Sequence, residues 1–263
     1  MVDLHCHILP GLDDGAATME QALELARAAQ AAGIDTLVAT PHIRDDHPFP
    51  LELIPERLEE LREALRDAEI AVKILTGGEV SLSKLPELSD EQLGPLCLGE
   101  GRYLLVESPY TQAPSLLETA LFDLQVRGFR PILAHPERSV TFLGDRARFQ
   151  ALLEQGVLCS VTAMSVAGGF GKLIRDFTMD LFASGLVHNI ASDSHDAKRR
   201  APGFASAFER MEDTLDGGAT GARWFVEDAA KAICEGRELP AGPPTLPIRP
   251  TAWKRITGRV GRA

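Results

Sequence analysis

The stretch Met1–Gly15 reads MVDLHCHILPGLDDG, and it places two histidines, His5 and His7, one residue apart. In a β-strand, alternate side chains point to the same face at a spacing of about 6–7 Å, so two imidazoles in these positions can share one cation. An isolated pair of this kind is more readily explained as polar residues at the end of a strand. The interpretation of the pair therefore depends on what the rest of the chain supplies.

The overall composition is that of a single α/β domain. The chain has 263 residues, of which 44% are hydrophobic, and this is enough to bury a sizeable core. Its formal net charge of −11 argues against nucleic acid, because binding to a phosphate backbone needs a positive surface. No run of about 18 apolar residues predicts a membrane span. The first predicted strand also begins too close to Met1 for a leader peptide, so we expect a cytoplasmic protein.

The cysteines do not carry the chemistry. Cys6, Cys97, Cys159 and Cys234 are far apart and form no C-x-x-C motif, which indicates buried, reduced thiols. No cysteine is followed by arginine at the C-x5-R spacing of the thiolate phosphatases. We therefore expect structural cysteines.

Short apolar runs alternate along the chain with amphipathic helical patterns. The runs predict seven strands, at Val2–His7, Thr36–Thr40, Ala71–Glu79, Tyr103–Glu107, Pro131–His135, Leu158–Thr162 and Leu186–Ser192. Helices are predicted at Thr18–Gly33, Pro55–Ala68, Leu116–Arg127, Arg146–Gln155, Leu173–Ala183, Phe204–Leu215 and Trp224–Cys234. This alternation is typical of parallel βαβ units, arranged either as a barrel or as an open doubly wound sheet.

The C-terminal segment departs from this pattern. Pro240–Ala263 reads PAGPPTLPIRPTAWKRITGRVGRA, which is rich in proline and contains five Lys or Arg and no acidic residue. Such a segment either pairs with an acidic surface or stays solvated. We expect a single domain over residues 1–239, followed by a flexible basic tail over residues 240–263.

Histidines and carboxylates gather at the predicted strand ends. In α/β barrels the C-terminal ends of the strands converge on one face, where active sites are built. Asp14 is not at a strand end but follows the first strand closely enough to join this set. We therefore predict a metal site whose nine candidate ligands are His5, His7, Asp14, His42, Glu79, Glu107, His135, Asp193 and His195.

Nine donors are more than one cation takes. Nitrogen and oxygen ligands without cysteine favour Mn, Fe, Co or Zn. Three divalent ions would outweigh the four carboxylates and leave the pocket at about +2, which suits a phosphate dianion. Clustered metals also activate water for in-line displacement. Arg138 and Arg200 present planar, paired donors for phosphate oxygens, although Arg200 follows Lys198 and Arg199 and could equally belong to a solvated basic run.

These motifs resemble the PHP (polymerase and histidinol phosphatase) superfamily. The resemblance is greatest to the bacterial capsule-associated, manganese-dependent protein-tyrosine phosphatases of the CpsB/CapC type. It runs from Met1 to about Glu238 and rests on DLHCHILPGLDDG, ATPH, GGEV, AHPER, SDSHDAKRRAP and EDAAKAICEG. It implies a distorted (βα)7 PHP barrel and a metal-dependent phosphatase that hydrolyses phosphotyrosine. The implied partner is a bacterial tyrosine kinase, phosphorylated on its tail, that controls capsule or exopolysaccharide synthesis.

The resemblance also implies roles for the site residues. His5, His7, Glu79 and Asp193 would hold the first of three divalent ions, with manganese the first choice. Glu79 would bridge to a second ion, shared with Glu107 and His135. Asp14, His42 and His195 would hold the third. A metal-bound hydroxide would attack phosphorus directly, and Arg138 and Arg200 would bind the phosphate.

Two departures and three alternatives accompany this interpretation. The residue after HPER is usually aromatic in these phosphatases but is Ser139 here, and the basic tail lies outside the family pattern.

The first alternative is a small-molecule phosphatase of the same superfamily, such as one that cleaves histidinol phosphate. A TatD-like metal nuclease also begins with H-x-H, but the acidic composition fits DNA poorly and the final D-x-H is not expected of it. A non-catalytic metal-binding module predicts missing ligands, and none is missing.

Overall fold

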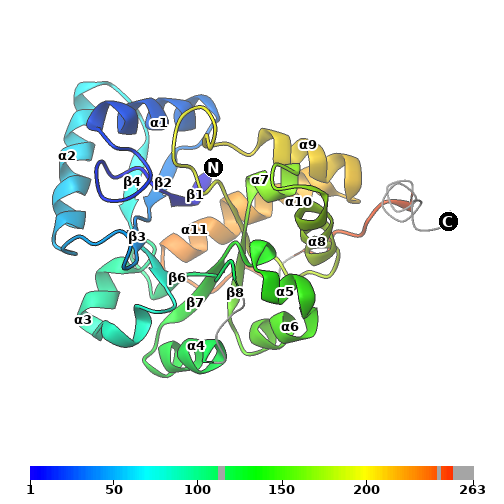
Figure 1. Ribbon diagram of the computed structural model, residues 1–263. Helices are drawn as coiled ribbons and strands as arrows, with labels where there is room; N and C mark the ends of the chain where they lie inside the picture. The colour runs from blue at the N-terminus through cyan, green and yellow to red at the C-terminus, as the bar shows by residue number, and fades with distance from the viewer. Residues whose placement is uncertain (112–115, 242–243, 251–263) are drawn as a thin grey trace.

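The computed structural model describes residues 1–111, 116–241 and 244–250, and it is an α/β fold built on short parallel strands (Figure 1). The strands are β1 (Val2–Cys6), β2 (Thr36–Ala39), β3 (His42–Ile43), β4 (Lys73–Thr76), β5 (Glu79–Ser81), β6 (Tyr103–Glu107), β7 (Arg130–Ala134), β8 (Leu158–Thr162) and β9 (Asn189–Ala191). All the pairs between these strands are parallel.

The strands form two sheets. One has the order β1-β2-β4 and the other the order β3-β5-β6-β7-β8-β9. The chain passes from the first sheet to the second twice, between β2 and β3 and between β4 and β5. The prediction of one continuous strand over Ala71–Glu79 is therefore wrong, because β4 ends at Thr76 and β5 begins at Glu79.

The breaks between β2 and β3 and between β4 and β5 both occur at proline or glycine. Pro41, between β2 and β3, has no backbone N–H to give to a sheet. Gly77 and Gly78 separate β4 from β5, and a Cβ atom on Gly77 would lie 2.8 Å from Cγ1 of Val38. The chain therefore turns there in a space that only glycine fits.

The far edges of the two sheets also meet. The segment after β9 lies beside the end of β1, where the N–H of Asp193 donates to the carbonyl of His5 at 2.9 Å and the N–H of His7 donates to the carbonyl of Ser194 at 2.9 Å. Cys6 and Ser194 form an isolated parallel bridge. The strands thus do not form one continuous hydrogen-bonded barrel, but the C-terminal ends of β1 and β9 lie together.

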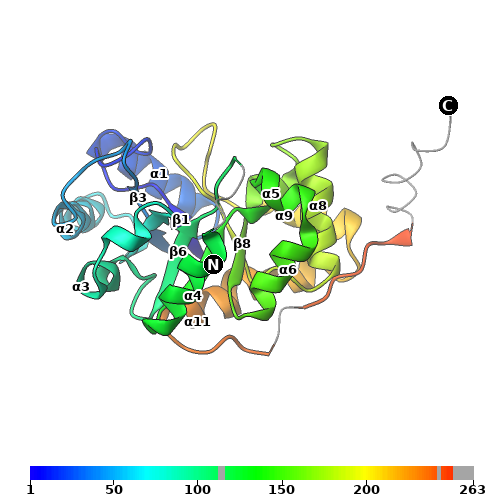
Figure 2. The same ribbon diagram turned by 60° about the horizontal axis from the view of Figure 1, so that its bottom comes forward.

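The longer helices follow the predicted patterns, with additional short ones between them. They are α1 (Met19–Ala31), α2 (Leu53–Asp67), α3 (Asp90–Leu93), α4 (Leu117–Val126), α5 (Val140–Gly144), α6 (Arg146–Glu154), α7 (Ala163–Ala167), α8 (Lys172–Ala183), α9 (Ala205–Thr214), α10 (Gly218–Arg223) and α11 (Ala229–Cys234). Thr18 caps α1 by accepting the N–H of Gln21, as the sequence predicts. Figure 2 shows the strands enclosed between α1 and α2 on one side and α5, α6 and α8 on the other.

Apolar side chains fill both faces of the strands. Leu4, Val38, Leu105 and Ile132 pack with Ile233 of α11 in one cluster, and the other strand faces pack in a larger cluster with the surrounding helices. The four cysteines are buried and free, as predicted. This two-sided burial leaves the carboxyl ends of the strands as the place where polar side chains gather.

The start of the predicted tail packs on the domain. Leu246 is buried and donates its N–H to the carbonyl of Phe182 at 3.1 Å, and Ile248 forms a bridge with Leu215. Residues 251–263, predicted to be flexible, lie outside the described residues, and the division at residue 239 stays a prediction.

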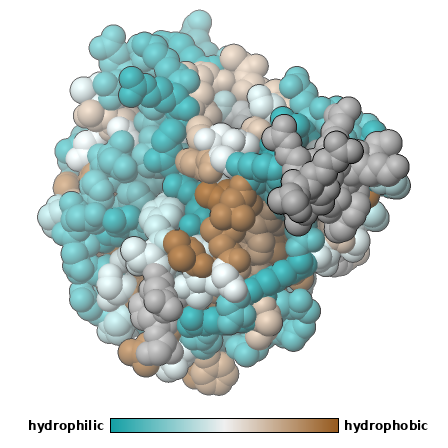
Figure 3. Space-filling model, turned by 45° about the vertical axis from the view of Figure 1, so that its right-hand side comes forward, coloured by the Kyte–Doolittle hydropathy of each residue, from teal (hydrophilic) through white to brown (hydrophobic). Residues whose placement is uncertain are grey.

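The face in Figure 3 carries one compact apolar patch surrounded by polar side chains. Among the exposed large apolar residues, Leu173 of α8 is 71% exposed and Val140 of α5 is 62% exposed. Among the helices of the described residues, none is both long enough and apolar enough to cross a membrane.

Candidate metal centre

The structure brings all nine predicted ligands together at the carboxyl side of the strands. Eight of them are buried, with at most 7% of their surface exposed, whereas the side chain of Asp14 is 50% exposed. Their donor atoms fall into four overlapping groups in which all atoms lie within 4.8 Å of one another. The groups are His7–Asp14–His42–His195, His5–His7–Asp193, His5–Glu79–His135 and His42–Glu79–Glu107.

Strand geometry explains the first of these contacts. His5 lies in β1 and His7 just beyond it, and their Nε2 atoms are 3.0 Å apart. Oδ1 of Asp193, from the segment after β9, lies 3.5 Å from both nitrogens. Two imidazole nitrogens and a carboxylate oxygen therefore converge on one point, as the alternation of side chains in a strand predicts.

Glu79 lies at the centre of the cluster. The register of β3 and β5 places His42 opposite Glu79, and Oε2 of Glu79 lies 2.8 Å from Nδ1 of His42. Its Oε1 lies 2.8 Å from Nε2 of His135. Burial opposes ionisation, but the surrounding histidines, His5 first, lower the pKa of Glu79 well below its usual range. Glu79 is thus a buried carboxylate able to serve two cations.

Glu107 is a second buried carboxylate, grouped with His42 and Glu79. It ends β6, and burial together with the nearby charge of Glu79 raises the pKa of its carboxyl group. Nη1 of Arg44 lies 2.5 Å from Oε1 of Glu107. Sequence reasoning missed Arg44, because it lies just beyond the two-residue strand β3 that the sequence did not predict.

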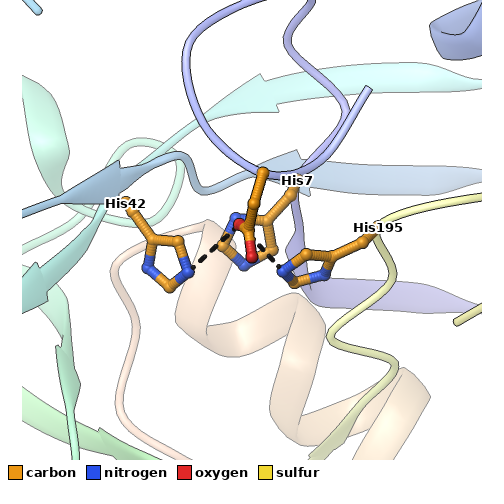
Figure 4. Close-up of side chains that lie close together, drawn as sticks. His7, His42 and His195 are labelled. Atoms are coloured by element: carbon orange, nitrogen blue, oxygen red, sulfur yellow. Dashed lines mark ion pairs between the residues drawn. The ribbon is translucent and has the colours of Figure 1, made fainter. Parts of the chain in front are cut away.

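Figure 4 shows His7, His42 and His195 around one carboxylate, and its ion pairs with His42 and His195 identify it as that of Asp14. Oδ1 of Asp14 lies 3.5 Å from Nε2 of His42 and 3.3 Å from Nε2 of His195. The contact with His195 is the main reason that the pKa of Asp14 is lowered. This group lies at the open side of the cluster, since Asp14 is its one exposed member.

Sequence reasoning also missed Asp13. Its Oδ2 accepts a hydrogen bond from Nδ1 of His7 at 2.7 Å and another from the N–H of His42 at 2.9 Å. Burial opposes both charges, yet this contact raises the pKa of His7 to about 10 and lowers the pKa of Asp13 to about 2. The doubled acid in GLDDG was the available signal. Gly15 is required beside it, because a Cβ atom there would lie 2.1 Å from the carbonyl oxygen of His7.

The two predicted phosphate-binding arginines also face the cluster. Nη1 of Arg138 lies 2.8 Å from Oδ2 of Asp193, and Nη2 of Arg200 lies 2.6 Å from the same atom. Arg138 also contacts two rings, those of Tyr110 and Phe170. Ser139, which stands where the resembling family has an aromatic residue, is wholly buried and does not line the opening of the site.

Positive φ angles and buried polar atoms without a hydrogen bond both occur within this cluster. His135 and Asp193 have positive φ angles of 38° and 54°, a conformation that costs about 1–3 kcal/mol for residues other than glycine and persists mainly at functional sites. Among the described residues, Oε2 of Glu79, Nδ1 of His42 and Nε2 of His195 are buried and form no hydrogen bond of good geometry. Their close neighbours are other members of the cluster, since Oε2 of Glu79 lies 2.8 Å from Nδ1 of His42 and Nε2 of His195 lies 3.3 Å from Oδ1 of Asp14. Nitrogen and oxygen donors held together in this way fit divalent transition-metal ions.

An α/β fold of parallel strands with histidines and carboxylates at their carboxyl ends is typical of metal-dependent hydrolases. Within that class, the chain belongs to the family described as "Capsular polysaccharide synthesis, CpsB/CapC", whose sequence model matches residues 1–233.

Named relatives support this assignment. Tyrosine-protein phosphatase YwqE of Bacillus subtilis is 36% identical over 203 residues, which cover 76% of this chain and 79% of YwqE. Tyrosine-protein phosphatase CpsB of Streptococcus pneumoniae is 26% identical over 243 residues, which cover 89% of this chain and 99% of CpsB.

Solved structures are also similar to this chain. One crystal structure, from work on YwqE of Bacillus subtilis and CpsB of Streptococcus pneumoniae as "unique metal-dependent tyrosine phosphatases", has a TM-score of 0.83 and 30% identity over 94% of this chain and 99% of its own. A histidinol phosphate phosphatase from Lactococcus lactis has a TM-score of 0.52 and 16% identity, over 94% of this chain and 98% of its own, and therefore shares the fold alone.

Proposed function

We propose that this protein is a metal-dependent protein-tyrosine phosphatase. Its substrate is phosphotyrosine on a bacterial tyrosine kinase that controls capsule or exopolysaccharide synthesis. The observation that carries the proposal is the convergence of nine nitrogen and oxygen donors on one buried cluster, in a chain whose relatives are named tyrosine phosphatases. The buried free cysteines favour a cytoplasmic location within the same proposal.

The donor groups support three divalent ions, with Mn the first choice and Fe, Co or Zn the alternatives. His5, His7, Glu79 and Asp193 would hold the first, and Glu79, Glu107 and His135 would hold the second. Asp14, His42 and His195 would hold the third. When bound, the ions activate water for attack on phosphorus and stabilise the charge of the transition state.

Arg138 and Arg200 bind the remaining phosphoryl oxygens. Both guanidinium groups lie within 2.8 Å of one oxygen of Asp193, so both point toward the same side of the cluster. Planar guanidinium groups donate paired hydrogen bonds to phosphate oxygens. Asp13 acts through His7, because it holds the ring so that Nε2 faces His5 and Asp193.

The proposal extends to the fold. If β2 and β3 are counted as one interrupted strand, and β4 and β5 as another, the nine strands reduce to the seven of a barrel. The bridge between Cys6 and Ser194 places the segment after the last strand beside the end of the first. We describe this arrangement as a distorted (βα)7 PHP barrel. We propose that residues 1–239 form its one domain and that Leu246 and Ile248 of the following segment pack against it.

The test uses the full-length protein purified without chelator. Its metal content is measured, and phosphate release from a phosphotyrosine peptide is followed before and after chelation. We expect chelation to abolish release and Mn²⁺ to restore it, with weak inhibition by orthovanadate because no cysteine acts as nucleophile. Full activity in metal-free protein would overturn the proposal.

A further inference from the structure

Two aromatic rings lie against Arg138, and the proposed machinery uses neither. The guanidinium carbon of Arg138 is 4.7 Å from the centre of the Tyr110 ring and 4.3 Å from that of Phe170. Tyr110 follows β6, and Phe170 precedes α8, so two loops distant in sequence supply the rings. Cation–π attraction accounts for their contact with Arg138.

Tyr110 also reaches the metal cluster. Its ring stacks on that of His135 with 5.1 Å between centres and 10° between planes, and its hydroxyl lies 3.3 Å from Nε2 of His135. Burial of that hydroxyl raises its pKa. The residue as a whole is nevertheless 39% exposed, and Phe170 is half-buried. Both rings therefore combine contact with the phosphate-binding arginine and access from solvent.

We propose that Tyr110 and Phe170 are specificity residues that contact the aromatic ring of the substrate whose phosphate Arg138 holds. This inference rests on the proposed function and names the feature that selects aryl over alkyl phosphates. In phosphotyrosine only one oxygen separates phosphorus from the ring, so a phosphate on Arg138 brings that ring next to the residues that flank the guanidinium group.

The expected contribution is moderate. Offset or edge-to-face ring pairs contribute enough to change binding by about three- to tenfold per ring. A serine phosphate has no ring and gains nothing from this contact. The two rings should thus affect the KM of aryl substrates while leaving the binding of bare phosphate unchanged.

The test compares variants that remove a ring with variants that keep one. Phe170→Leu and Tyr110→Leu remove a ring and retain apolar volume, whereas Phe170→Tyr and Tyr110→Phe keep it. Phe122→Leu is the matched control, because Phe122 is 61% exposed on α4. For each variant, kcat and KM are measured with a phosphotyrosine peptide, and the Ki of inorganic phosphate is measured as a competitive inhibitor. Circular dichroism checks folding.

We expect each leucine variant to raise the KM of the phosphotyrosine peptide at least threefold, with the Ki of phosphate within twofold of the wild-type value. The ring-retaining variants should keep the KM of the peptide within twofold of the wild-type value, and Phe122→Leu should behave as wild type. A parallel rise of the phosphate Ki would show that the rings only hold Arg138, and an unchanged KM would show that they contact nothing; either result overturns the inference. A wild-type protein without activity on phosphotyrosine would instead overturn the proposed function and this inference with it.

Discussion

Nδ1 of His7 lies 2.7 Å from Oδ2 of Asp13, and both side chains are buried. Because an ionised carboxylate only accepts hydrogen bonds, Nδ1 of His7 carries the proton and donates it. In neutral His7, the form that binds a metal ion, the lone pair is then on Nε2, which faces His5 and Asp193 at 3.0 and 3.5 Å. Asp13 thereby fixes both the tautomer and the orientation of a proposed metal ligand.

Asp13→Asn should therefore weaken metal binding without removing a ligand. Partners that orient a metal-bound histidine contribute about 10–100-fold to metal affinity or activity. We expect the Mn²⁺ concentration for half-maximal activity to rise by at least tenfold, with kcat at saturating Mn²⁺ less affected. Asp67→Asn, an exposed change of the same type at the end of α2, should leave the metal dependence unchanged. An unchanged Mn²⁺ requirement in Asp13→Asn would contradict the orienting role.

Substitution of the proposed ligands themselves should reduce activity far more than Asp13→Asn does. His135→Ala and Asp193→Ala each remove a donor from the buried cluster, and we expect kcat/KM to fall by two or more orders of magnitude while the protein still folds. His188→Gln is the matched control, because His188 lies outside the cluster, where its Nδ1 accepts the N–H of Cys159 at 3.1 Å. Metal content and kcat/KM are measured for all three. Near-normal activity in His135→Ala would remove that residue from the site.

Much of the cluster could be predicted, because parallel strands bring their carboxyl ends together and the chain places a histidine or a carboxylate at most of those ends. His5 and His7 share a face for the simple reason that strands have a period of two. Asp13 and Tyr110 could not be assigned in this way. Both lie in loops, where the position of a side chain depends on tertiary contacts such as the approach of Gly15 to the backbone of His7.

The break between β4 and β5 illustrates the same limit for the fold. The sequence of Ala71–Glu79 is apolar enough to be one strand, and neighbouring glycines are compatible with a bulge as well as a break. What separates the strands is the packing of Val38 and Leu98 against Gly77. Those neighbours lie far from Gly77 in the sequence, so local pattern alone does not reveal them.

His188 should make stability depend on pH away from the cluster. Burial lowers its pKa from 6.5 to about 4. As the pH falls from 6.5 toward 4, the unfolded chain binds a proton at His188 that the folded chain does not, so the free energy of unfolding decreases. At pH 5 the expected loss is about 2 kcal/mol relative to pH 7.5.

His188→Gln keeps a hydrogen-bond acceptor for Cys159 but does not titrate. Urea unfolding of both proteins at pH 7.5 and pH 5 isolates the contribution, since the other titrating groups are common to both. The variant should lose less stability than the wild type on acidification. Equal losses would mean that His188 titrates in the folded protein as it does in the unfolded chain.

Substrate preference separates a tyrosine phosphatase from a small-molecule phosphatase with the same fold. The phenolate of tyrosine has a pKa of about 10, whereas the alkoxide released from histidinol or serine is several units more basic and is a poorer leaving group. An enzyme that relies on cations and arginines to stabilise the phosphoryl group should therefore favour aryl phosphates. We expect kcat/KM for a phosphotyrosine peptide to exceed that for histidinol phosphate, and for the same peptide with phosphoserine, by at least tenfold at one Mn²⁺ concentration. If histidinol phosphate were the better substrate, the protein would be a small-molecule phosphatase that uses the same nine ligands.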